Sequence, residues 1–270
     1  MNYRHAFHAG NFADCLKHAV LVWLLRAMAR KPAGFLYLDT HAGIGRYDLS
    51  AGPAERTGEW RAGIARLRPD PALADYLAQI EALGLYPGSP VLARALLRPQ
   101  DRMIACELHP EDYRSLRHAF LDDPQAAIHK RDAWEALGAF LPPPERRALV
   151  LIDPPYEEPD EFTTLATALI AAHRRFPTGV YAAWYPIKHR APVRAFHTLI
   201  KDAGMRDVVA AELALRAPLD PARLNGCGLL IVNPPYRLEA EIPPMLDALL
   251  AGLGTGEAGA YPSVERLTDE

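Results

Sequence analysis

The sequence predicts an α/β fold with a seven-stranded, mostly parallel sheet that is covered by helices on both faces. Seven short apolar runs recur along the chain, and helical patterns separate most of them. Strands that alternate with helices favour parallel pairing through right-handed crossovers. Half of the 270 residues are hydrophobic and 23% are charged, which is the composition of a globular chain with a substantial core.

The first helix is expected to begin after Asn11, a good N-cap residue, and to end before Pro32. Aromatic and aliphatic side chains run together in each expected strand. The expected strands are residues 35–39, 102–107, 127–129, 148–153, 179–185, 207–215 and 228–233. Residues 216–227 join the last two without a helical pattern, so we expect an antiparallel hairpin at the end of the sheet.

The interval between the first two strands is unusually long. In a nucleotide-binding α/β fold, the acid that meets the ribose follows the glycine loop by about 20 residues, whereas Asp39 and Glu107 are 107 − 39 = 68 positions apart. Residues 48–92 therefore predict a helical insertion over the site, or an extension without a ligand role. We expect a main domain of residues 1–47 and 93–250, with an N-terminal substrate arm, and a C-terminal tail over residues 251–270. The glycine-rich stretch of this tail, residues 252–259, is expected to be frayed.

Composition excludes several classes of protein. The longest apolar run covers residues 19–25, far short of the roughly 20 residues that span a bilayer, and no small-residue cleavage site follows it. Cys15, Cys106 and Cys227 are widely spaced, so we interpret them as core residues rather than as disulfide or zinc ligands. We expect a cytoplasmic protein that does not associate with a membrane.

The formal net charge of −3 conceals two basic stretches. Residues 1–31 hold five basic side chains against one acid. The second stretch contains Lys188, Arg190, Arg194, Lys201 and Arg206. Such stretches permit a polyanionic partner, although most are simply solvated faces.

The first candidate site follows the first strand, at residues 39–46. Gly43 and Gly45 form a G-x-G turn, where the backbone can approach a ligand and helix N–H groups are free. Asp48 stands where a third phosphate-binding glycine is expected. The loop suits a nucleoside without phosphates, such as S-adenosyl-L-methionine, better than a dinucleotide, although a plain strand-to-helix turn has the same pattern.

Two acids follow the next two expected strands. Glu107 ends the second strand, where a carboxylate can accept hydrogen bonds from both ribose hydroxyls. Asp132 follows the third strand, where its side chain and the neighbouring backbone can bond the edge of an adenine. Each acid alone is more often solvated, so the two carry weight only in combination.

The strongest signal is Asp153-Pro154-Pro155-Tyr156, at the end of an apolar run. An exocyclic amine is a poor nucleophile because its lone pair is conjugated with the ring, so its methylation requires acceptors for the N–H protons. Asp153 supplies a carboxylate, and Pro154 supplies a carbonyl without a competing N–H. Tyr156 can stack on a base removed from its helix. We therefore expect Asp153, Pro154 and Tyr156 to be catalytic.

A second motif of the same type, Asn233-Pro234-Pro235-Tyr236, follows the last expected strand. If that strand runs antiparallel to the others, its end points away from the ligand crevice, which lies at the carboxyl ends of the parallel strands. We therefore favour Asp153 and interpret Asn233 as structural.

The first 18 residues are rich in aromatic and polar side chains. His5, His8 and His18 lack a Cys or an acid that completes a metal site, so no metal is expected. We interpret the segment as a polar lid, in which Tyr3, His5 and Lys17 contact the substrate while Lys17 and His18 face the cofactor. A capped helix with a solvent-exposed face is the alternative.

These motifs together resemble the RlmJ-type bacterial methyltransferases, which methylate N6 of an adenine in 23S ribosomal RNA. The resemblance covers nearly the whole chain. It rests on residues 3–18, 38–47, 87–90, 107–110, 131–132 and 153–157. The opening block YRHAFHAGNFADCLKH is highly specific, whereas DPPY is shared by amino-methyltransferases in general.

The resemblance implies a class I S-adenosylmethionine-dependent methyltransferase fold, Rossmann-like with a helical insertion, and a target customarily numbered adenine 2030. It implies a cofactor site lined by His18, His41, Ser89, Glu107, Asp132, Ala133 and Asp153. It also implies that Asp153 is the proton acceptor and that Tyr3 contacts RNA. Ala133 replaces a glycine common in the family, although a backbone contact survives the change. Ser89 before Pro90 is equally explained as a helix N-cap.

We therefore expect transfer of a methyl group to adenine N6 in 23S rRNA by a monomer that uses no metal. The substrate would be free rRNA or an early assembly intermediate. A DNA adenine methyltransferase is the nearest alternative, but groove readout usually requires a larger recognition domain. A non-catalytic RNA-binding or ribosome-assembly protein is a second alternative, and a nicotinamide-dependent oxidoreductase, which lacks its phosphate-binding glycines here, is a third.

Overall fold

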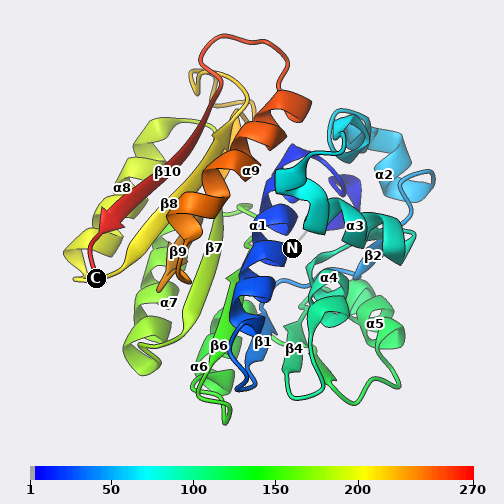
Figure 1. The fold of residues 1–270 in the computed structure, drawn as a ribbon, viewed down its shortest axis with the longest axis vertical. Coiled ribbons are helices and arrows are strands. Elements are labelled where there is room, and N and C mark those ends of the chain that lie inside the picture. The colour runs from blue at the N-terminus through cyan, green and yellow to red at the C-terminus, as the bar shows by residue number, and fades with distance from the viewer. Residues whose placement is uncertain (1–3) are drawn as a thin grey trace.

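The computed structural model describes residues 4–270. Within that range, eight strands form one sheet in the order β10-β8-β9-β7-β6-β1-β4-β5 (Figure 1). The strands are β1 Leu36–Asp39, β4 Arg102–Cys106, β5 Ala126–His129, β6 Ala148–Ile152, β7 Val180–Ile187, β8 Val208–Ala214, β9 Gly226–Val232 and β10 Tyr261–Thr268. Strands β5, β4, β1, β6 and β7 are parallel to their neighbours among these five, which confirms the expected mostly parallel α/β sheet.

Helices cover both faces of the sheet. The α-helices are α1 Phe12–Ala29, α2 Gly52–Thr57, α3 Ala74–Leu83, α4 Ser89–Leu96, α5 Pro110–Ala119, α6 Ala133–Phe140, α7 Glu161–Arg175, α8 Arg190–Asp202 and α9 Leu238–Leu253. The 3-10 helices are η1 His5–Phe7, η2 Glu59–Arg61, η3 Ile64–Arg66 and η4 Pro71–Leu73. Helices α6, α7 and α8 pack on one face, and α1, α4, α5 and α9 pack on the other (Figure 1).

The register of the central strands brings the candidate acids to one edge of the sheet. Asp39, the last residue of β1, pairs with Ala105 of β4 on one side and with Leu151 of β6 on the other. Glu107 and Asp153 each lie two residues beyond these partners in the sequence. The carboxyl ends of the three strands therefore place both acids at the same edge, where ligands bind in open α/β sheets.

Strand β9 runs antiparallel to both β7 and β8, as expected from the missing helix between the last two apolar runs. Its last residue pairs with Tyr181, near the start of β7, so Asn233 lies at the edge opposite to Asp153. The Asn233 side chain donates hydrogen bonds to the carbonyls of Pro177 and Gly179, at 2.7 and 2.6 Å. Its contacts are structural, in agreement with the interpretation of the second motif.

The sheet has one strand more than the expected seven. Strand β10 lies in the expected C-terminal tail, beyond its glycine-rich stretch, and pairs antiparallel with β8. Arg266 fastens it through ion pairs to Asp207 and Glu239, at 2.7 and 2.5 Å. No strand was expected at residues 261–268, because β10 is an edge strand that buries only Leu267 and its sequence has no apolar run.

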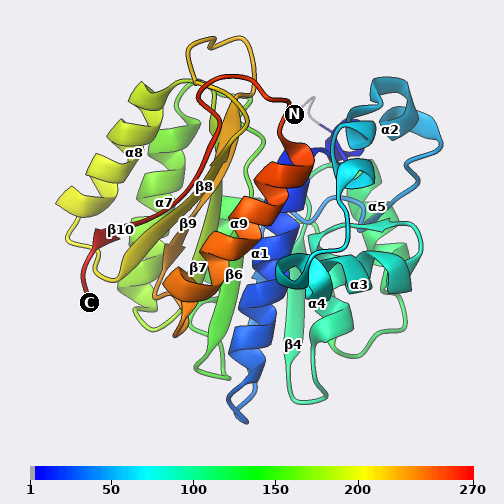
Figure 2. The same ribbon diagram turned by 45° about the horizontal axis from the view of Figure 1, so that its top comes forward.

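Helix α1 begins where predicted, with Oδ1 of Asn11 accepting a hydrogen bond from the Asp14 N–H at 3.0 Å. The helix is covered on nearly all sides, because the sheet lies on one side and α4 and α9 lie on others (Figure 2). Even its polar residues Asp14, Lys17 and His18 are at most 4% exposed. Polar groups at this depth require partners, and their partners lie in the candidate site.

Between β1 and β4 the chain leaves the sheet, as the long interval predicts. Strands β2 Arg46–Tyr47 and β3 Tyr86–Pro87 pair antiparallel where the chain leaves the sheet and where it returns. Its helices lie beside the N-terminal segment, where the Ile64 N–H donates to the Gly10 carbonyl at 2.9 Å. A Cβ on Gly63 would lie 2.0 Å from the same oxygen, so this contact requires glycine. The division into a main domain and an insertion subdomain stays a prediction.

The structure bears on two expectations from the composition, one about the cysteines and one about a membrane span. Cys15, Cys106 and Cys227 are all buried and form no disulfide, so they are core residues as interpreted. Over residues 4–270, no helix is long and apolar enough to cross a bilayer.

Candidate active site

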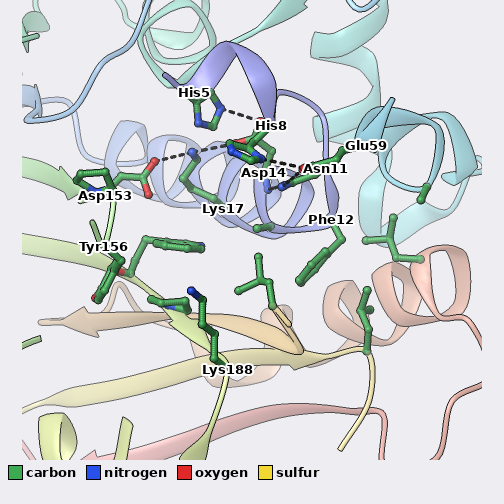
Figure 3. A pocket seen from close by; sticks show the side chains of 18 of the residues that line it. His5, His8, Asn11, Phe12, Asp14, Lys17, Glu59, Asp153, Tyr156 and Lys188 are labelled. Atoms are coloured by element: carbon green, nitrogen blue, oxygen red, sulfur yellow. Dashed lines mark hydrogen bonds and ion pairs between the residues drawn. The ribbon is translucent and has the colours of Figure 1, made fainter. Parts of the chain in front are cut away.

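Asp153, the first residue after β6, lies at the boundary between two cavities. The larger cavity has a volume of about 530 Å³ (Figure 3), and the smaller has a volume of about 230 Å³. His5, Asp153 and Pro155 line both of them. A group held in one cavity can therefore reach a group held in the other beside the Asp153 carboxylate.

The smaller cavity is built by the loops that follow β1, β4, β5 and β6. It brings together five of the seven residues expected at the cofactor. They are His41, Glu107, Asp132, Ala133 and Asp153. The parallel register explains this convergence, because each of these residues lies at or just beyond the carboxyl end of a strand.

Glu107 is held in place by two backbone donors. Its Oε2 accepts from the Gly43 N–H at 2.9 Å, and its Oε1 accepts from the His109 N–H at 2.7 Å. Burial raises the pKa of the carboxyl. Each oxygen retains a second lone pair for a ligand hydroxyl. Gly43 has φ +62°, and a Cβ there would lie 2.3 Å from the Tyr47 hydroxyl, so the turn of the G-x-G loop requires glycine.

Asp132 is the N-cap of α6. Its Oδ1 accepts from the backbone N–H groups of Trp134 and Glu135, at 2.9 and 3.2 Å. The first turn of α6 borders the smaller cavity. The Ala133 N–H in this turn has no acceptor within the helix. A cap and a free N–H at this place can recognise a polar edge of a flat ring.

His41 lines the smaller cavity between Asp153 and Trp134. Its Nδ1 accepts from the Asp153 N–H at 3.3 Å, and its ring meets Trp134 edge-on with centroids 5.6 Å apart. Burial lowers the pKa of His41 to about 4. His41 is therefore neutral at physiological pH, which suits a residue that accepts through Nδ1.

A buried chain of charges leads from Asp153 to the N-terminal segment (Figure 3). Nζ of Lys17 lies 2.6 Å from Asp153 and 2.9 Å from Asp14, and His5 Nε2 lies 2.9 Å from the other oxygen of Asp14. Burial opposes the charge on Lys17, but the two carboxylates outweigh it and hold its pKa well above the usual value. Burial likewise opposes the charge on Asp14, yet His5 and Lys17 hold its pKa well below the usual value. Lys17 and Asp14 are therefore both charged at neutral pH.

The larger cavity contains the rest of the DPPY motif. Pro154 and Tyr156 line it together with Trp184 from β7. Tyr156 adopts a left-handed backbone conformation with φ +54°, and its hydroxyl donates to the Trp184 carbonyl at 3.2 Å. The Trp184 and Phe162 rings meet it edge-on, at 5.7 and 4.8 Å between centroids. The Tyr156 ring is thus fixed at the wall of this cavity.

The expected substrate contacts lie in part at this cavity. His5 and Lys17 line it. Tyr3 lies outside the described residues. The described part of the chain contains no cluster of three or more His, Cys, Asp or Glu side chains able to hold a metal ion.

His18 and Ser89, also expected at the cofactor, line neither cavity. His18 is fully buried, with Nδ1 3.0 Å from the Tyr86 hydroxyl, and burial lowers its pKa to about 3. Its Nε2 has no hydrogen-bond partner within residues 4–270. Burial raises the pKa of Asp39 at the end of β1 to about 6, and the nearby Ser89 hydroxyl partly offsets this rise. Ser89 is the first residue of α4 rather than its N-cap, which is Gly88, because the extended backbone ends one residue earlier.

Sequence reasoning did not select Asp14, Glu59, Trp184 and Arg216, and it placed Lys188 only in a basic stretch. All five line the larger cavity. A signal was available for two of them. Lys188 directly follows β7, and Arg216 follows β8, which runs in the same direction as β7, so both lie at the ligand edge of the sheet.

Comparison with known proteins places the chain in a family. The profile described as "Ribosomal RNA large subunit methyltransferase D, RlmJ" matches residues 32–264. The chain is 41% identical to "Ribosomal RNA large subunit methyltransferase J" of Escherichia coli (strain K12), over 96% of this chain and 97% of that protein. It is 42% identical to the protein of the same name from Haemophilus influenzae (strain Rd), over the full length of both.

A solved structure agrees with these relatives. The crystal structure of a protein from Legionella pneumophila str. Philadelphia 1 matches with a TM-score of 0.86 and 35% identity, over 96% of this chain and 98% of that one. The expected class I methyltransferase fold is confirmed. The chain belongs to the RlmJ family of ribosomal RNA large subunit methyltransferases.

Proposed function

We propose that the protein transfers a methyl group from S-adenosylmethionine to N6 of an adenine in 23S rRNA, at the position customarily numbered 2030. The observation that carries this proposal is the position of Asp153 between two cavities. The smaller cavity would hold the nucleoside of the methyl donor, and the larger one the target base. Reaction requires that the two meet in line, and holding them in that geometry supplies much of the rate.

The residues of the smaller cavity fit the nucleoside of S-adenosylmethionine. The Glu107 carboxylate, fixed by the Gly43 and His109 N–H groups, has lone pairs for two ribose hydroxyls. The Ala133 N–H and the Asp132 carboxylate suit the adenine edge. His18 and Ser89 line neither cavity, so their expected contacts with the cofactor rest on the resemblance alone. Bound there, S-adenosylmethionine supplies a methyl group activated by its sulfonium.

Asp153 and Pro154 would hold the amine of the target base. Lys17 occupies Oδ2 of Asp153, while Oδ1 has no hydrogen-bond partner within the described chain and remains for one N–H of the amine. The Pro154 carbonyl would accept the other N–H. With both protons engaged, the nitrogen lone pair is drawn out of conjugation and towards the methyl group. Asp153 then takes the proton that the amine loses, and Tyr156 stacks on the base.

The family supports rRNA as the polymer that is methylated. Both curated relatives are named ribosomal RNA large subunit methyltransferases, which favours rRNA over DNA and over a catalytically inactive role. Adenine 2030 as the target rests on the resemblance in the motifs. A monomer that acts in the cytoplasm on free 23S rRNA or an early assembly intermediate completes the proposal.

The test is nucleoside mass spectrometry after incubation with S-adenosylmethionine and unmodified 23S rRNA, with duplex DNA in a parallel reaction. N6-methyladenosine in the RNA alone is expected, and primer extension on a short fragment would then map the position. Methylated DNA, or a methyl group on another atom of the RNA, would contradict the proposal. A reaction with assembled particles but not with free rRNA would correct only the form of the substrate.

A further inference from the structure

The larger cavity extends well beyond the DPPY motif. Its 530 Å³ lie within the range of roughly 300–1,000 Å³ that holds a whole small ligand, so it is roomier than one purine base requires. Away from Asp153 the lining comes from the start of α1, the insertion, the end of β7, the loop between β8 and β9, and the end of α9. We call this part the second chamber; it is lined by Phe12, Ala62, Leu215, Leu224, Leu253, Lys188 and Arg216.

The second chamber has an apolar wall with an aromatic ring in it. Phe12, the first residue of α1, is only partly buried and lines the cavity. Figure 3 shows Phe12 and Tyr156 on opposite sides of the cavity, so one aromatic ring borders each part. Aromatic rings beside a cationic groove are the usual platform for successive bases of a single strand.

The second chamber also carries positive charge. Lys188 reaches into the cavity from the end of β7 (Figure 3), and its ammonium has no hydrogen-bond or ion-pair partner within the described part of the chain. Arg216 is fixed by hydrogen bonds to Glu257 and to the Leu224 carbonyl, at 2.8 and 3.1 Å. Glu257 is shared with Arg223, so one acid faces two guanidinium groups. A net positive charge remains.

The acids that line the cavity do not neutralise Lys188. Asp14 and Asp153 share Lys17. Both oxygens of Glu59 are occupied, by His8 at 2.9 Å and by Asn11 at 3.0 Å. The ammonium of Lys188 is therefore available to bind an anionic group of the ligand.

We propose that the second chamber binds the nucleotide adjacent to the target adenine, with its base against Phe12 and the linking phosphate against Lys188 and Arg216. This inference rests on the proposed function and deepens it. It defines the substrate at this site as at least two nucleotides of a splayed single strand, because a duplex cannot place two neighbouring bases in separate pockets.

The test combines binding and kinetics on the full chain. Adenosine and the dinucleotide ApA are titrated into the wild type, Phe12→Leu, Lys188→Ala and Lys201→Ala. In ApA either adenine can enter the target site, so the other one serves as its 5′ or 3′ neighbour. Lys201 is an exposed lysine of α8 away from the cavity, so its variant controls for the loss of one charge. Thermal unfolding and the affinity for S-adenosylmethionine show whether each variant is folded.

We expect the wild type to bind ApA at least tenfold more tightly than adenosine, and each chamber variant to lose most of this advantage. Lys188→Ala should raise KM for rRNA and reduce the slope of log KM against log salt by about 0.7, the value for one phosphate contact on a single strand. Lys201→Ala should match the wild type.

The outcomes separate the two proposals. If the wild-type protein does not methylate rRNA, the proposed function is wrong, and the proposal for the second chamber, which rests on it, is wrong as well. Wild type that methylates rRNA, but binds ApA no better than adenosine and shows equal salt slopes for Lys188→Ala and Lys201→Ala, overturns the second chamber alone.

Discussion

Nζ of Lys17 lies 2.6 Å from Oδ2 of Asp153, a residue 136 positions further along the chain. This buried ion pair joins helix α1 to the end of β6. Since Lys17 also contacts Asp14, it directs one oxygen of Asp153 away from the substrate and leaves the other for it. The expected catalytic carboxylate is thus oriented by the N-terminal helix and not by its own loop.

Replacing Asp153 should remove turnover while the fold survives. Asp153→Ala removes the acceptor for one amine proton, so kcat should fall at least about 100-fold, the usual scale for one acid–base group. Asp153→Asn keeps an acceptor oxygen and should lose less. Single-turnover methyl transfer measures the rate, and calorimetric titration with S-adenosylmethionine checks that binding persists. A folded Asp153→Ala with wild-type turnover is incompatible with the proposed role.

Replacing Lys17 should affect stability and activity together. Lys17→Met removes the ammonium shared by the buried carboxylates of Asp14 and Asp153, and removal of one member of a buried ion pair costs about 3–5 kcal/mol. Urea unfolding of Lys17→Met should show a loss of this order, whereas the exposed Lys31→Met should change little. At temperatures where Lys17→Met is folded, kcat should also fall because Asp153 is no longer oriented. A stable variant with normal turnover would show that the pair does not matter.

The central strands and the acids at their ends were predictable because each apolar run lies between breakers and ends at the ligand edge. Strand β10 was not, since an edge strand buries too little to mark its sequence. The burial of Lys17 was hidden for another reason. Helical spacing reveals one core face, but it does not reveal that α4 and α9 cover the remaining sides of α1.

Long-range partners were hidden as well. Glu59 lies 48 and 51 positions from Asn11 and His8, and only the folded insertion brings them together. Arg216 differs from Glu59, because it follows a strand that ends at the ligand edge of the sheet. The chemistry of the site was therefore predictable where it lies at strand ends, and unpredictable where it depends on how loops pack.

Replacing Glu107 should separate cofactor binding from catalysis. Glu107→Ala removes the acceptor of two backbone N–H groups and both expected ribose contacts. We expect at least a tenfold loss of affinity for S-adenosylmethionine by calorimetric titration, with partial recovery of kcat at saturating cofactor. The exposed acid Glu111 provides a matched control, Glu111→Ala. Equal affinities for Glu107→Ala and the control would remove Glu107 from the cofactor site.

The neutral state of His18 predicts a loss of stability in acid. Its pKa is about 3 when folded and about 6.5 when unfolded, so between these values only the unfolded chain binds the proton. The free energy of unfolding should therefore fall as pH decreases, by about 1.4 kcal/mol per pH unit from this residue. His18→Gln should be less acid-sensitive by that slope between pH 6.5 and 5 in urea unfolding. Parallel curves for the two proteins would show that His18 is charged in the folded state.

The contact of Glu59 with His8 and Asn11 predicts that the insertion positions the N-terminal segment. Glu59→Ala removes the carboxylate that binds His8 and Asn11. Hydrogen exchange over residues 4–11 should become faster, because local opening becomes easier. KM for rRNA should rise about fivefold or more, since His5 belongs to the same segment, while the affinity for S-adenosylmethionine should hold. Glu81→Ala, an exposed acid of α3, is the control. If exchange at residues 4–11 is the same in both variants, the segment is held by its backbone contacts at Gly10 and not by Glu59.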